Sequence, residues 1–149
     1  MKHPSPLVLL LFLAIACLLS SCAGGFDRRW RGAEDVRGRT GIEGRWDGTW
    51  RSHVNGHHGR LRCIVSPTEQ PGVYQFHYGG TFARILGFQY TVDYAVQRRR
   101  GTWTMKGESD LGWMGGAYSH EATVKDGEFK ATYRSARDHG VFAMRRVVQ

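Results

Sequence analysis

The strongest constraint on the fold is a two-residue alternation between apolar and polar side chains. Between residues 88 and 97, polar residues for the most part separate the apolar positions Phe88, Tyr90, Val92, Tyr94 and Val96. A strand with one buried face repeats every two residues, whereas a surface helix repeats about every 3.6 residues. Beyond residue 19 the chain has only three leucines, while aromatic residues make up 12% of the whole sequence. Because leucine favours helix cores and aromatic side chains favour pleated sheets, we expect an all-β domain.

Two glycine-containing dipeptides predict β-hairpins and fix their expected register. Both central positions of a two-residue hairpin turn need positive φ, which Asn-Gly and Asp-Gly tolerate. A turn at Asn55-Gly56 would place Trp50 opposite Leu61, and a turn at Asp126-Gly127 would place Val124 opposite Phe129 and His120 opposite Tyr133. In both hairpins the apolar residues then share one face, as a buried sheet surface requires.

Further strands are expected where short alternating runs lie between turn residues. These runs are Val73–Tyr78, Thr81–Leu86, Thr102–Lys106 and Val141–Arg145. About eight strands joined by short turns predict an antiparallel meander, and closing it into a small barrel would remove the exposed strand edges. In pattern, the tryptophan-rich first strand and the final strand resemble small lipocalin- or avidin-type barrels. The resemblance implies a closed or nearly closed barrel, which we place at residues 44–149.

The first 22 residues have the pattern of an export signal. Lys2 and His3 precede an uninterrupted run without polar side chains at residues 7–19, and Ser20 and Ser21 follow it. A run of this length rises about 20 Å as a helix, which is less than the roughly 30 Å of a hydrocarbon core. We therefore predict a secretory signal helix and not a permanent membrane span.

The end of this signal is more specific. The segment Leu19-Ser20-Ser21-Cys22 resembles the lipobox of bacterial lipoproteins. The resemblance implies cleavage after residue 21 and lipid attachment at Cys22, so the protein would be exported and held on a membrane by its N-terminus. Because residue 23 is not aspartate, the resemblance favours the periplasmic face of the outer membrane in a Gram-negative cell. The alternative is an ordinary cleaved signal that happens to end in cysteine.

Residues 22–43 are predicted to be a flexible basic tether between the lipid and the barrel. They contain five arginines and no sustained periodicity. A flexible chain of this length has a typical reach of about 25 Å. We expect its arginines to rest on anionic headgroups, with Phe26 and Trp30 available to insert at the interface.

The formal net charge is +8, which favours anionic partners. An exported protein meets anionic envelope polymers and lipid headgroups before nucleic acid, so no nucleic acid partner is expected. One hypothesis is therefore a polyanion- or partner-binding envelope module that uses its arginine-rich surface. The alternative is a solvated cationic surface with no specific partner.

The leading functional hypothesis is a small apolar ligand held in the barrel. The inward parity of the predicted strands includes Trp46, Trp50, Tyr90, His120 and Tyr133. Small-molecule pockets combine apolar walls with a few polar groups, so these residues are the candidate ligand-binding wall. The alternative is a core network in which His120 and Tyr133 bond only to other protein groups.

The first predicted hairpin also contains a weak candidate metal site. With a turn at Asn55-Gly56, His53 would lie directly opposite His58, and two facing imidazoles suit a transition metal. The neighbouring His57 would point to the other face. The alternative is an exposed polar hairpin tip.

No catalytic constellation is visible in the sequence. It lacks a nucleophile elbow, a phosphate-binding loop, a paired-carboxylate signature and a strong metal motif. After signal cleavage and modification of Cys22, Cys63 is the last free cysteine, so no intramolecular disulfide is expected. We therefore expect a binding or structural protein without a cofactor, and a His-dependent hydrolase or isomerase is the less favoured alternative.

Overall fold

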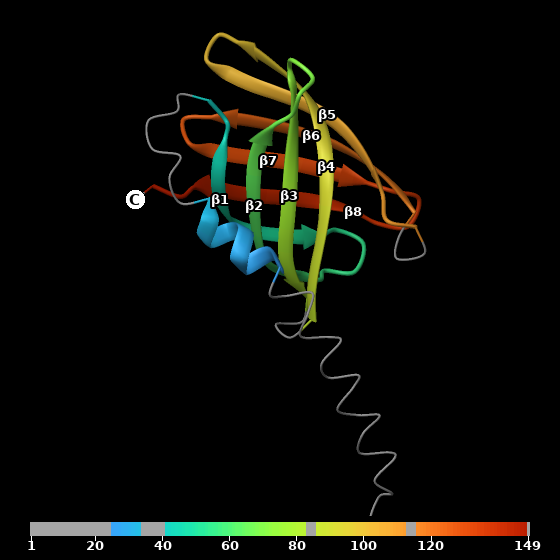
Figure 1. The fold of residues 1–149 in the computed structure, drawn as a ribbon. Coiled ribbons are helices and arrows are strands. Elements are labelled where there is room, and N and C mark those ends of the chain that lie inside the picture. The colour runs from blue at the N-terminus through green and yellow to red at the C-terminus, as the bar shows by residue number, and fades with distance from the viewer. Residues whose placement is uncertain (1–24, 34–40, 83–85, 113–115, 149) are drawn as a thin grey trace, which may run out of the picture.

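The protein folds into a closed eight-stranded barrel in which each strand pairs antiparallel with its neighbours in sequence and β1 also pairs with β8 (Figure 1). The structure, a computed structural model, describes residues 25–33, 41–82, 86–112 and 116–148. The strands are β1 (Gly44–Ser52), β2 (His58–Pro67), β3 (Val73–Phe82), β4 (Leu86–Arg99), β5 (Thr102–Asp110), β6 (Ala117–Lys125), β7 (Glu128–Arg134) and β8 (His139–Arg146). The predicted all-β class and the closed antiparallel meander are confirmed.

The alternation in the sequence separates the barrel interior from its surface. In β6, His120, Ala122 and Val124 are buried, while the residues between them are exposed. The interior is built mainly from rings, and the largest side chains without solvent contact include Trp46, Tyr78, Tyr94, Phe76 and Phe129. Aromatic side chains fill a small barrel because each buries a large area in a fixed orientation.

The second predicted hairpin is confirmed. Asp126 and Gly127 both have positive φ, at 50° and 76°, and Val124 lies opposite Phe129. The first hairpin has a different register from the predicted one, because Trp50 faces Gly59 and not Leu61.

The turn chemistry explains this shift of two residues. The loop spans residues 53–56 and is closed by a hydrogen bond from Ser52 N to His57 O (2.8 Å). Ser52 Oγ accepts from Val54 N and Asn55 N, and of the dipeptide only Gly56 has positive φ. An even shift preserves parity, so the inward-facing residues are unchanged.

The predicted separate strand at Thr81–Leu86 is wrong. Thr81 and Phe82 are the last residues of β3, Leu86 is the first residue of β4, and Phe82 pairs with Leu86. The segment therefore joins two strands of one hairpin. Its residues 83–85 lie outside the described ranges.

Part of the predicted flexible tether is a helix. Residues 25–32 are helical and lie across the outer face of β1, β2 and β3 (Figure 1). Phe26 is only 4% exposed and packs on the barrel, so the prediction that it is available to insert into a membrane is wrong. The predicted signal and Cys22 lie outside the described residues. Within the described ranges, a helix with the length and hydropathy of a membrane span is absent.

Candidate functional site

The side chains inside the barrel form two groups at opposite ends. At one end, which we call the Trp46 end, the Trp46 ring packs on Phe129 with centroids 6.0 Å apart. Its Nε1 donates to Ile42 O (2.9 Å), and the Arg146 guanidinium lies 4.6 Å from its ring centroid. Trp46 has no solvent contact. The Trp46 end is therefore a packed plug, and Trp46 does not line a site with the other candidate residues.

The opposite end, which we call the His120 end, holds Trp50, Tyr90, His120 and Tyr133. His120 projects inward from β6 and is only 3% exposed. Its Nε2 shares a hydrogen bond with Ser109 Oγ on β5 (2.9 Å). Its Nδ1 is buried, and no described residue donates or accepts a hydrogen bond there. A buried polar atom without a partner is uncommon in folded proteins and requires an explanation.

Burial determines the protonation state of this histidine. Removal from water disfavours the charged imidazolium and lowers the pKa of His120 to about 4. The imidazole is therefore neutral near pH 7, with one N–H and one lone pair. Since Ser109 engages Nε2, the remaining capacity of the ring is at Nδ1.

Aromatic rings surround His120 at nearly equal distances. Their centroids lie 6.1 Å to 6.3 Å from the imidazole centroid, and they belong to Tyr94, Tyr90, Tyr118 and Phe142. Tyr90 and Tyr118 are partly exposed, while Tyr94 is fully buried. The imidazole thus lies between buried rings of the core and rings that are partly exposed to solvent.

Each of four rings in this half of the barrel lies across from a glycine. The pairs are Trp50 with Gly59, Phe88 with Gly80, Tyr94 with Gly107, and Tyr133 with Gly140. A Cβ on Gly140 would lie 2.6 Å from the Tyr133 hydroxyl, and one on Gly59 would lie 2.9 Å from Trp50 Nε1. The same Cβ atoms would lie even closer to backbone oxygens, at 2.0 Å from Arg51 O and 1.9 Å from Thr81 O, so these glycines make room for neighbouring backbone as well as for the rings.

The barrel wall is incompletely hydrogen-bonded beside His120. The ladder between β4 and β5 begins at Asp93 and Glu108, so the first half of β4, from Leu86 to Val92, pairs with β3 alone among the described strands. Tyr90 lies on this half, and Ser109 lies just beyond Glu108, the last β5 residue that pairs with β4, although Ser109 still pairs with Tyr118 of β6. The partly exposed rings and the open ladder occur on the same side of the barrel.

A polar network closes the neighbouring part of the His120 end. Ser52 Oγ donates to Asp138 Oδ1 (2.6 Å), and the Tyr133 hydroxyl donates to Asp138 Oδ2 (3.2 Å). Burial, followed by the negative charge of Asp138, raises the pKa of Tyr133. The phenol therefore stays protonated and ties β7 to the loop before β8. Tyr133 has a structural bond here, unlike the Nδ1 atom of His120.

The sequence missed Ser109 because the predicted strand ended at Lys106. The inward parity of β5 continues through Gly107 to Ser109, and Gly107 lies opposite His120. A glycine in an alternating run resembles a strand end, although here its missing Cβ makes room for Asp93 O, Val92 and the Tyr94 ring. The continued parity was the signal that could have found Ser109.

The histidine pair behind the predicted metal site does not form. His58 lies opposite Arg51, and the ring beside His53 is that of His139, at a centroid distance of 5.9 Å. His57 packs edge-on against Phe82. Within the described residues, no group of three or more His, Cys, Asp or Glu side chains is placed to hold a metal ion.

A groove of about 700 Å³ lies on the outside of the same strands. Its walls include the exposed residues Ser119, Glu121, Thr132 and Arg134, which alternate with the inward-facing His120 and Tyr133. His120 and Tyr133 are themselves among the lining residues, so the groove adjoins the part of the wall that carries the candidate ligand-binding residues.

The fold and the site define an antiparallel β-barrel with a packed plug at one end and a buried, partly unpartnered histidine at the other. The chain matches no protein-family model, and comparisons with curated proteins and with solved structures returned no significant match.

Proposed function

We propose that the protein is a binding module for a small, mostly aromatic or apolar molecule with one polar group. The observation that carries the proposal is the buried Nδ1 of His120, which lacks a partner among the described residues. A ligand that enters between the partly exposed rings of Tyr90 and Tyr118 would contact apolar walls and place its polar group on Nδ1. The packed Trp46 end confines such a ligand to the other half of the barrel.

The energetics support a ligand with a polar group. A buried polar atom without a partner costs about 1–3 kcal/mol, and a hydrogen bond from the ligand would remove that cost. Because the imidazole is neutral near pH 7, it does not demand a charged ligand. The surrounding rings favour a flat molecule that stacks or packs edge-on.

A matched pair of probes tests this proposal. Naphthalene and 2-naphthol differ by one hydroxyl group, and titration calorimetry would give their affinities for the wild type. We expect the wild type to prefer 2-naphthol by roughly fivefold to tenfold, because one buried hydrogen bond contributes about 1 kcal/mol or slightly more. His120→Leu should bind naphthalene and lose the preference for the hydroxyl.

His58→Leu is the matched control, because His58 is an exposed histidine at the start of β2. It should keep the wild-type preference. Failure of the wild type to bind either probe, or the same preference in His120→Leu, would contradict the proposal.

We further propose that the protein is exported and anchored to a membrane through lipid on Cys22, as the lipobox-like segment suggests. Each buried methylene contributes about 0.8 kcal/mol, so several acyl chains give lasting attachment. Cys22→Ala should release the protein from the membrane fraction. Cys17→Ala, at the other cysteine of the predicted signal, should leave it there. Equal membrane recovery of both variants would refute the anchor.

A further inference from the structure

The helix at residues 25–32 packs on the barrel through a specific, shape-complementary contact. The Phe26 ring occupies a notch over Gly79, where an added Cβ would lie 2.6 Å from ring carbon Cγ. On its other side the ring stacks on His77, with centroids 5.5 Å apart. Thr91 and Gln89 hold both nitrogens of that imidazole in place. The ring therefore fits only because β3 has a glycine at this position.

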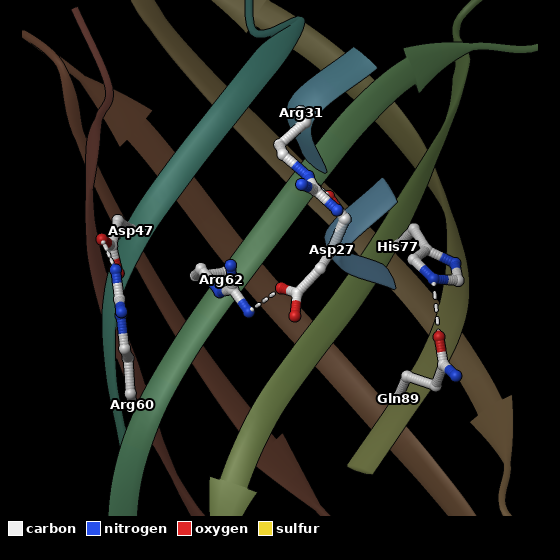
Figure 2. A network of polar contacts seen from close by, with 7 residues as sticks. All are labelled: Asp27, Arg31, Asp47, Arg60, Arg62, His77 and Gln89. Atoms are coloured by element: carbon white, nitrogen blue, oxygen red, sulfur yellow. Dashed lines mark hydrogen bonds and ion pairs between the residues drawn. The ribbon is translucent and has the colours of Figure 1, made fainter. Parts of the chain in front are cut away.

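Arginine side chains of the barrel complete the seat (Figure 2). The Arg62 guanidinium lies 5.0 Å from the centroid of Phe26 and 5.2 Å from that of Trp30, and it donates to Asp27 Oδ1 (2.7 Å). Arg45, only 8% exposed, lies 5.2 Å from the Trp30 centroid. Cation–π contacts and an ion pair thus hold one face of the helix on β1 and β2.

The opposite face of the helix is cationic. Arg28, Arg29 and Arg31 are exposed, and no carboxylate of the described residues pairs with any of them. Two nearby carboxylates are paired with arginines of β2, because Asp27 of the helix pairs with Arg62 and Asp47 of β1 pairs with Arg60 (Figure 2). Among the described residues, this outward surface therefore carries positive charge without a paired carboxylate.

We propose that this face, defined by Arg28, Arg29 and Arg31, seats the barrel on an anionic lipid surface. The inference rests on the proposed lipid anchor at Cys22. The first described residue of the helix, Gly25, lies three positions after that cysteine, and three residues span at most about 11 Å. A docked helix therefore keeps the barrel against the membrane that carries the anchor.

The contacts of the helix with the barrel also determine which side chains can reach the lipid surface. Phe26 and Trp30 are engaged by the barrel, so contact with the membrane comes from charge and not from inserted rings. Each arginine near an anionic surface raises membrane occupancy by about fivefold, and salt screens the effect. The outer face of β1–β3 then faces the lipid, and the arginines of the β4–β5 turn, at the Trp46 end, do not.

Arginine-selective labelling with phenylglyoxal tests this orientation. The full chain, processed in a bacterium and purified from its membranes, is reconstituted into vesicles that contain phosphatidylglycerol or only phosphatidylcholine. We expect Arg28 and Arg29 to react about fivefold more slowly on the anionic vesicles, and high salt to remove the difference. Arg98 and Arg99, which are exposed at the β4–β5 turn, should react equally on both.

Two charge-reversal variants provide a matched comparison, read at Arg31. Arg28→Glu with Arg29→Glu should abolish the protection of Arg31. Arg98→Glu with Arg99→Glu makes the same change in net charge and should leave the protection intact. Equal labelling on both vesicles, or protection of Arg98 as strong as that of Arg28, would overturn the inference.

The mass of the N-terminal peptide separates this inference from the anchor. If Cys22 carries lipid but Arg28 and Arg29 show no selective protection, the docking on anionic lipid is refuted and the lipid anchor stands. If a chain without lipid still shows selective protection, the lipid anchor is refuted, and the docking of the arginine face on anionic lipid stands.

Discussion

Adding one methyl group to Gly79 should dislodge the N-terminal helix. A Cβ at this position would lie 2.6 Å from Cγ of Phe26 and 2.7 Å from Cδ1 and Cδ2. Carbon atoms pack at about 3.5–4.0 Å, so the ring or the helix must move by about 1 Å. The ring cannot tilt away easily, because His77 stacks on it and Arg62 lies over it. We expect Gly79→Ala to lower the free energy of unfolding by about 1–3 kcal/mol, which is typical of overpacking.

A double-mutant cycle isolates the physical cause. Phe26→Ala should cost about 2 kcal/mol, because it exposes one buried ring. In a Phe26→Ala background the added methyl at Gly79 meets no ring, so the double variant should cost no more than Phe26→Ala alone. Urea denaturation gives the free energies, and hydrogen exchange at residues 25–33 should speed up in all three variants. Additive costs, or unchanged exchange in Gly79→Ala, would refute this account of the seat.

Three further predictions concern the barrel itself. Burial lowers the pKa of His120 from 6.5 to about 4. As the pH falls, the unfolded chain therefore binds a proton at this histidine before the folded chain does. The contribution of the neutral histidine to the free energy of unfolding is complete above about pH 6.5 and is reduced by up to roughly 3 kcal/mol as the pH drops towards 4. Urea denaturation across this range should show that loss in the wild type and a smaller one in His120→Leu; equal losses would contradict it. Asp138→Asn should lower the free energy of unfolding by about 1–3 kcal/mol, because the charged acceptor of Ser52 is lost, and an unchanged midpoint would contradict this. Gly127→Ala forces a side chain into positive φ (76°) and should cost about 1–2 kcal/mol, whereas Gly87→Ala meets no atom within 4 Å and should cost less in the same assay.

The sequence correctly predicted which side chains face inward. Parity depends only on local strand geometry, so it survived the two-residue error in the first hairpin, and Trp50 faces inward in either register. The second hairpin was predicted fully, because Asp126 and Gly127 adopt the tight turn that their residue types favour.

The helix was missed although its signal was present. Phe26 and Trp30 are four residues apart, a spacing that places them on one helix face, and their rings lie 6.0 Å apart. Two positions are too few to establish a period, and an isolated helix of eight residues is not stable without tertiary contacts. Its stability comes from Gly79, His77 and Arg62, which the sequence alone does not place beside it.

The candidate ligand-binding residues show the same division between what local sequence preference predicts and what tertiary contacts decide. Sequence parity grouped Trp46 with Trp50, Tyr90, His120 and Tyr133, and the tertiary structure separated Trp46 from the other four. Parity states which face a residue is on, but its height in the barrel depends on loop lengths and on the stagger of every strand pair. The open ladder beside Tyr90 arises from that stagger.

By itself, the sequence determined the all-β class, the inward-facing residues and the tight β6–β7 turn, because each follows from local backbone preference. Only the tertiary structure decided that His120 bonds to Ser109 through one nitrogen and leaves the other without a described partner. It also decided that Arg62 meets Asp27, 35 residues away in the chain. Such contacts depend on barrel closure, which brings distant segments together at distances that no local period encodes.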